Sequence, residues 1–156
     1  MKPQDLLVGE LAPILREAGF RKERSTWRRA EAETILVLNL QKSSWGENFF
    51  INLGVYFRVL GPEQKPPAHR CHLGCRAEAI PEAMPLLSRA LDFDPPTGVS
   101  EEERRSAVRE IAGHALSWLR ARRTVDGARL EHQAESHTRC LVHTEARDLL
   151  GLSSIR

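Results

Sequence analysis

The sequence has little net charge, few cysteines and no long hydrophobic run. Its 156 residues include 23 basic and 21 acidic side chains, and the resulting charge of +2 is too small to indicate a nucleic-acid or membrane-surface specialist. Three cysteines are an odd number for a domain of this size, which argues against disulfide stapling. The longest apolar stretches, 35–40 and 49–57, have the length of strands, whereas a membrane-spanning helix needs about 20 apolar residues. Because no signal-peptide pattern follows Met1, we expect a cytoplasmic protein with reduced thiols and no membrane partner.

The motifs of common enzyme classes are also missing. The sequence has no glycine-rich phosphate loop ending in Gly-Lys-Ser/Thr, no Gly-x-Gly-x-x-Gly after a strand and no His-Glu-x-x-His. No sharp turn presents a cysteine, serine or threonine as a nucleophile. We therefore assign no catalytic residue, expect no cofactor and favour a protein that is not an enzyme. What is present is a mix of 41% hydrophobic and 28% charged residues, which can fold around a core.

A helix is expected near the N-terminus. Residues 4–18 place apolar side chains at helical spacing, and Gly19 can take the left-handed conformation that ends a helix. Pro13 lies inside this pattern and removes one backbone donor. It predicts either a kink or a helix that starts later.

The strongest helix signal lies in the second half of the chain. Ser100 followed by Glu103 forms a capping box, which predicts a long helix that begins there and continues to about Arg123. Shorter helices are expected at 81–91 and 144–150.

Between residues 20 and 77 the hydrophobic period changes to two, which is typical of strands. We expect strands at 20–24, 26–29, 34–42, 48–59 and 70–77. If the two long strands form a hairpin, their apolar faces must coincide, because one face of the sheet is buried. This constraint gives a register that pairs Asn39 with Asn52, Gln41 with Phe50 and Ile35 with Tyr56.

These elements predict one α+β domain over residues 1–156. An antiparallel sheet of four to five strands packs its apolar face against the N-terminal helix and the long helix near 100–123. A Pro-rich loop at 92–99 leads into the long helix.

The second face of the sheet is mixed and supplies the main candidate site. Asn39, Gln41 and Asn52 are poor strand formers in long strands. Either a helix covers them and they bond internally, or the face is open and contacts a partner. Trp45 at the hairpin tip favours the second alternative, because an exposed tryptophan is a common anchor in interfaces. With a partner bound, Trp45 and Tyr56 would supply apolar area with a polar handle.

A metal site is the second candidate. Cys71 and Cys75 together with Cys140 and His143 would supply the four ligands of a structural zinc ion. The spacing of the first pair is uncommon, and lone cysteines of this kind are usually buried small apolar residues. We therefore assign no metal and keep these four residues as a weaker hypothesis.

A nucleic-acid surface is the third candidate. Five basic residues lie near Trp27, namely Arg21, Lys22, Arg24, Arg28 and Arg29. Positive charge on a strand edge also discourages edge pairing, and Trp27 fits a core position better than a stacking platform. We do not expect a nucleic-acid partner.

Residues 20–57 resemble a bacterial family, the domain of unknown function 4304. The similar segments are the helix end Ala18-Gly19-Phe20-Arg21-Lys22, the strand Asn39-Leu40-Gln41-Lys42-Ser43 and the strand Phe49-Phe50-Ile51-Asn52-Leu53-Gly54. The pair Cys71-His72 is similar to a family position after a Pro-rich loop, which weakens the zinc hypothesis. The resemblance implies an α+β domain without an established activity, some members being associated with immunity to bacterial toxins. It also draws attention to Ser43 beside the amide residues, because these are the polar positions of the similar motif.

The sequence therefore predicts a cytoplasmic protein-binding module, acting as an immunity-type inhibitor if the resemblance extends to function. Its binding residues would be Asn39, Gln41, Ser43, Trp45, Asn52 and Tyr56. The alternative is a small-ligand or metal-dependent enzyme around Cys71, His72, Cys75, Cys140 and His143.

Overall fold

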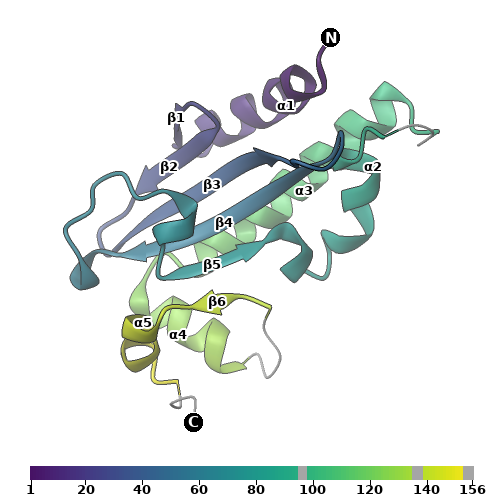
Figure 1. Ribbon diagram of the computed structural model, residues 1–156. Helices are drawn as coiled ribbons and strands as arrows, with labels where there is room; N and C mark the ends of the chain where they lie inside the picture. The colour runs from purple at the N-terminus through teal and green to yellow at the C-terminus, as the bar shows by residue number, and fades with distance from the viewer. Residues whose placement is uncertain (95–97, 135–138, 153–156) are drawn as a thin grey trace.

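The computed structural model describes residues 1–94, 98–134 and 139–152 (Figure 1). The helices are α1 (Pro3–Glu17), α2 (Leu87–Leu91), α3 (Glu101–Ala121), α4 (Val125–Ala134) and α5 (Thr144–Leu149). The strands are β1 (Arg21–Glu23), β2 (Thr26–Ala30), β3 (Thr34–Lys42), β4 (Phe49–Phe57), β5 (Leu73–Arg76) and β6 (Leu141–Val142). Of the expected loop at 92–99, residues 95–97 lie outside the described ranges.

The strands form one antiparallel sheet in which sequence order equals spatial order, from β1 at one edge to β6 at the other. The α+β prediction is confirmed, with one strand more than the expected four to five. The additional strand, β6, has two residues, and its pairing with β5 depends on a contact between distant segments. β5 is shorter than the expected 70–77, because 3-10 turns at 68–70 and 77–79 flank it.

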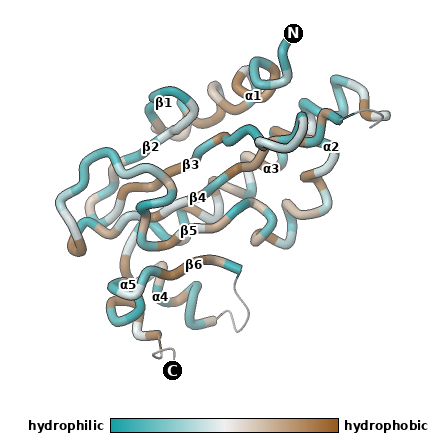
Figure 2. The backbone as a smooth tube through the Cα atoms, viewed as in Figure 1, coloured by the Kyte–Doolittle hydropathy of each residue, from teal (hydrophilic) through white to brown (hydrophobic). Residues whose placement is uncertain are grey.

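The register of the β3–β4 hairpin is as predicted. Asn39 pairs with Asn52, Gln41 with Phe50 and Ile35 with Tyr56. This register places the alternate leucines of β3 and the odd-numbered residues of β4 in one buried cluster. Hydrophobic residues accordingly run along the central strands (Figure 2).

Helices α1 and α3 cover that apolar face of the sheet (Figure 1). The apolar stripe of α1 is fully buried at Leu7, Leu11 and Leu15. The two helices are also joined by Glu10, whose carboxylate accepts hydrogen bonds from Arg105 at 2.8 Å and from Arg109 at 3.1 Å. Burial of Glu10 disfavours its charged form, but the two arginines outweigh this effect and lower its pKa.

Both helix starts follow from local chemistry. The Ser100–Glu103 capping box is formed: the Glu103 N–H donates to Ser100 Oγ at 3.1 Å, and the Ser100 N–H donates to Glu103 Oε2 at 3.4 Å. α1 begins with Pro3 in its first turn and continues through Pro13, so the expectation of a later start is wrong. Gly19, with φ of +89°, follows its end.

Helix α4 was not predicted, and it packs on the C-terminal end of α3 through the buried side chain of His132. Arg122 is also buried and donates from Nε to His132 Nε2 at 3.0 Å. Its guanidinium lies 4.0 Å from the centre of the Trp118 ring, and its Nη1 donates to the Trp118 carbonyl. Burial, and then the charge of Arg122, lower the pKa of His132 to about 4.

The expected helix at 81–91 is broken into a 3-10 turn at 84–86 and the single turn of α2. Within the described residues, no helix is both long enough and apolar enough to cross a bilayer.

Candidate functional site

The sheet face opposite α1 and α3 is partly covered by a loop and partly open. A small apolar cluster of Ile35, Val37, Tyr56 and Cys71, packed against Ala68, lies under the segment that joins β4 to β5. Beside this cluster, the same face contributes Thr26, Asn39, Gln41 and Asn52 to a groove of about 860 Å³. The expectation of a covering helix is wrong, because the cover over one end of this face is the loop that joins β4 to β5. The other end is open, and contact with a partner there stays a prediction.

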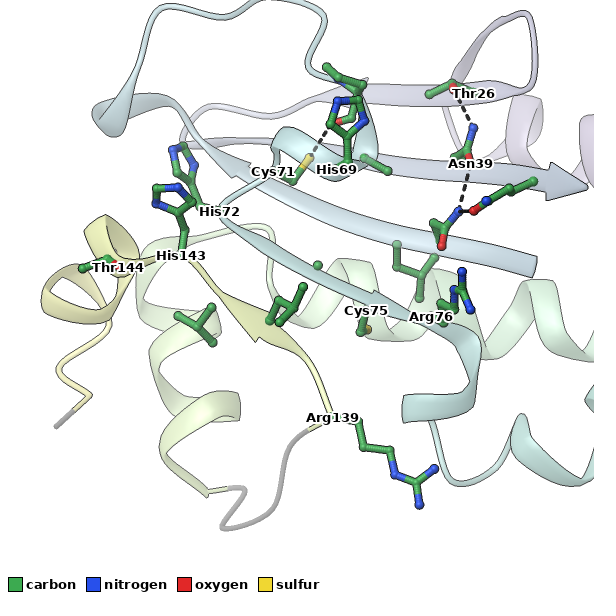
Figure 3. Close-up of a pocket in the computed structure, with 18 residues that line it drawn as sticks. Thr26, Asn39, His69, Cys71, His72, Cys75, Arg76, Arg139, His143 and Thr144 are labelled. Carbon is green, nitrogen blue, oxygen red and sulfur yellow. Dashed lines mark hydrogen bonds between the residues drawn. The ribbon is translucent and has the colours of Figure 1, made fainter. Parts of the chain in front are cut away.

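The groove is built from three parts of the chain (Figure 3). Strands β2 to β5 form its floor, which carries Thr26, Asn39, Gln41, Asn52 and Arg76. The loop at 67–72 forms one side, and the segment at 139–144, which includes β6, forms the other. Its size lies within the range of sites that hold small molecules or short peptide segments.

An amide cluster, defined as Thr26, Asn39, Gln41 and Asn52, organises the floor. Asn39 Nδ2 donates to Thr26 Oγ1 at 3.0 Å and to the Ser25 carbonyl at 3.3 Å. Asn52 Nδ2 donates to Asn39 Oδ1 at 3.0 Å and to Gln41 Oε1 at 2.9 Å. These bonds fix the side chains of three neighbouring strands, so the polar floor is preorganised.

Two groups of this cluster remain available to a ligand. Asn52 Oδ1 and Gln41 Nε2 have no hydrogen-bond partner among the described residues, and Gln41 is exposed. One is an acceptor and the other a donor, and they belong to adjacent strands. Such a pair matches the N–H and C=O groups of a peptide backbone.

Arg76 extends this polar floor on β5. It pairs in register with Asn52, and its guanidinium carbon lies 3.9 Å from the centre of the Phe50 ring. A cation at this distance is attracted to the ring face, and the Arg76 residue is exposed. Alternation along the predicted strand at 70–77 could have placed Arg76 on the mixed face. The sequence gives no sign, however, of the contact between the Arg76 guanidinium and the Phe50 ring.

His72 and Cys71 at the covered end have structural roles. His72 Nδ1 accepts a hydrogen bond from the Phe57 N–H at 2.9 Å, and burial lowers the pKa of this imidazole. The Cys71 thiol donates to the Pro67 carbonyl at 3.6 Å, and burial raises its pKa to about 12. Because the thiolate is the nucleophilic form, this environment suppresses the reactivity of Cys71.

The four-ligand zinc hypothesis is not met by the geometry. Cys71 belongs to the small cluster on the groove face, whereas Cys75 belongs to the main core on the opposite face of the sheet. Their side chains cannot reach one ion together. Within the described residues no three His, Cys, Asp or Glu side chains, Cys140 and His143 included, gather in a metal-binding arrangement.

The other predicted binding residues lie apart from the amide cluster. Ser43 accepts a hydrogen bond from the Trp45 N–H in the hairpin loop, and Trp45 is 97% exposed. This loop is braced by Asp94, whose Oδ1 accepts from the Glu47 N–H at 3.0 Å. Tyr56 is buried at the other end of β4, where its hydroxyl accepts from the Glu63 N–H.

Comparison with known proteins gives one family. The model of a domain of unknown function, DUF4304, matches residues 11–121. The chain belongs to the DUF4304 family. Neither a curated protein nor a solved structure gave a match.

The DUF4304 match covers the floor of the groove but not all of its sides. β1 to β5 and α3 fall inside residues 11–121, and the loop at 67–72 does so as well. The side at 139–144, with β6, lies beyond the match. Sequence reasoning named Cys140 and His143 in this segment as candidate ligands but predicted no strand there, because β6 is short and the segment between Arg123 and Thr144 has no strong periodic signal.

Proposed function

We propose that this DUF4304 protein is a non-enzymatic binding module of the bacterial cytoplasm that holds a protein partner in the sheet-face groove. The observation that carries the proposal is the amide cluster, whose internal bonds leave one acceptor and one donor without a hydrogen-bond partner among the described residues. The side chains are already ordered, so little conformational entropy is lost on binding. A partner backbone would satisfy both groups.

Trp45 would supply a second contact. It is almost fully exposed on a braced loop, and large aromatic side chains contribute strongly when an interface buries them. As an immunity-type inhibitor, the protein would block a toxin's site stoichiometrically. The near-neutral charge of +2 makes a strongly basic nuclease an unsuitable toxin, because its inhibitor would be acidic.

The alternative, a small-ligand or metal-dependent enzyme around Cys71, His72, Cys75, Cys140 and His143, has less support. The thiol of Cys71 is buried with a pKa of about 12. His72 already uses Nδ1 to accept the Phe57 N–H. Neither group is in the state that nucleophilic catalysis requires.

Partner capture tests the proposal. The tagged protein would be incubated with lysate of its source bacterium, cross-linked, and the captured proteins identified by mass spectrometry. Asn52→Ala should fold normally, since the side chain is part-exposed, and should reduce capture of the specific partner at least tenfold. Gln4→Ala removes an exposed amide from α1 and is the matched control, which should leave capture unchanged. Equal capture by wild type and Asn52→Ala would reject the proposed binding face.

A further inference from the structure

The two charged residues among the described lining of the groove are both arginines, Arg76 on the floor and Arg139 in the segment at 139–144. Two neutral histidines lie on opposite sides, His69 in the loop at 67–72 and His143 in the segment at 139–144. No Asp or Glu is among the described lining residues, although the chain has 21 acidic side chains. The groove therefore favours a ligand that carries negative charge.

Arg76 is the residue in the groove best placed to bind an anion. Other arginines of the chain, such as Arg105 and Arg109, are engaged by carboxylates. Arg76 contacts only the face of Phe50 among the interactions found for it in the described residues, and it forms no ion pair there. A guanidinium held by stacking presents two parallel N–H donors at its edge, which is the geometry that binds a carboxylate.

The surroundings of Arg76 select a peptide over a small free anion. Asn52, its register partner, offers an acceptor, which would repel an anion but suits a backbone N–H. The groove also contains apolar surface from Pro67, Ala68 and Val142. A volume of about 860 Å³ exceeds what one phosphate or acetate ion would fill.

We propose that the groove binds an acidic segment of the partner protein, with one Asp or Glu side chain on Arg76. The carboxylate accepts two hydrogen bonds from the guanidinium, and Gln41 Nε2 and Asn52 Oδ1 bind the adjoining backbone. This inference rests on the proposed function and specifies the chemistry of its partner.

Titration of the ¹⁵N-labelled full chain with a hexaglutamate peptide tests the inference, with NMR used to follow backbone and side-chain amides. Saturable shift changes are expected at Gln41, Asn52, Gly74 and Arg76. Arg76→Gln should weaken binding about tenfold or more, because a charge-assisted hydrogen-bonded pair is lost. Arg120→Gln is the matched control: it removes the same charge from an exposed position on α3, behind the sheet, and should have no effect.

Several outcomes would overturn the inference. Arg76→Gln and Arg120→Gln would weaken peptide binding equally, or hexaglutamine would bind as tightly as hexaglutamate. The shift changes would centre on the basic strands β1 and β2 instead of the groove. Inorganic phosphate or oligothymidylate would compete with the peptide at an equal concentration. If hexaglutamate fails while partner capture still depends on Asn52, the acidic segment is rejected and the binding module stands. If hexaglutamate binds but Asn52→Ala captures the partner as well as the wild type does, the proposed function fails, and the acidic partner segment fails with it.

Discussion

Acid should destabilise this protein through His132. In the folded state its Nε2 accepts the Arg122 Nε–H, so a proton on Nε2 would set two donors against each other in a buried site. The pKa is about 4 in the folded protein and 6.5 in an ordinary histidine. Between these values the unfolded chain binds more protons than the folded one. The free energy of unfolding therefore falls as the pH drops from 6.5 to about 4. Below this window, His132 lowers it no further.

The size of the effect follows from the two pKa values. One pH unit within the window is worth about 1.4 kcal/mol, so lowering the pH from 7 to 4.5 should cost about 2.5 kcal/mol. For a domain of this size, that corresponds to a shift of roughly 1 M in the urea midpoint. The same loss would lower Tm by roughly 5–10 °C.

Urea denaturation at both pH values, followed by far-UV circular dichroism, measures this loss. His132→Gln is the matched variant, because an amide oxygen can accept from Arg122 but does not take up a proton in this range. The wild type should lose about 2.5 kcal/mol more than the variant on going to pH 4.5. All carboxylates titrate in both proteins and cancel in the comparison. An identical pH dependence in the two proteins would refute the reasoning.

Three further predictions concern the fold. Ser100→Ala should lower the free energy of unfolding by about 1 kcal/mol in urea denaturation, because the cap of α3 is lost. The control is Ser106→Ala, at an exposed position inside α3. Equal losses in the two variants would contradict a capping role. Gly54→Ala should cost about 1–3 kcal/mol in the same assay, because its Cβ would lie 2.6 Å from the Cys71 sulfur, and an unchanged midpoint would mean that this packing is loose. Trp45→Phe should remove the tryptophan emission that acrylamide quenches most readily, because Trp45 is 97% exposed. The free energy of unfolding should change by less than about 0.5 kcal/mol. If the readily quenched emission persists in the variant, Trp45 lies in a covered site.

The sheet was the predictable part of the fold. Alternation in β3 and β4, with the need to bury one common face, gave the register that pairs Asn39 with Asn52. The capping box gave the start of α3 for a similar reason, since all of its atoms lie within one turn. These features depend on neighbours that are close in sequence.

What could not be predicted depends on distant contacts. The two residues of β6 become a strand only because β5 is beside them, and α4 is fixed by the buried contact between Arg122 and His132. The amide residues of the candidate site were visible as unfavourable strand residues. Arg76 was not, because its orientation is set by the Phe50 ring on another strand.

The boundary of the family match separates the floor of the groove from its side at 139–144. The strands of the floor also belong to the folded core, because their other face packs against α1 and α3 behind Asn39 and Asn52. The side at 139–144 carries exposed residues, with Leu141 81% exposed, and lies outside the DUF4304 match. Substitutions at such exposed positions would alter this border of the groove at little cost in stability. In the proposed function, the sheet would serve as a constant platform, and a change of partner would require changes at the border of the groove without refolding of the sheet.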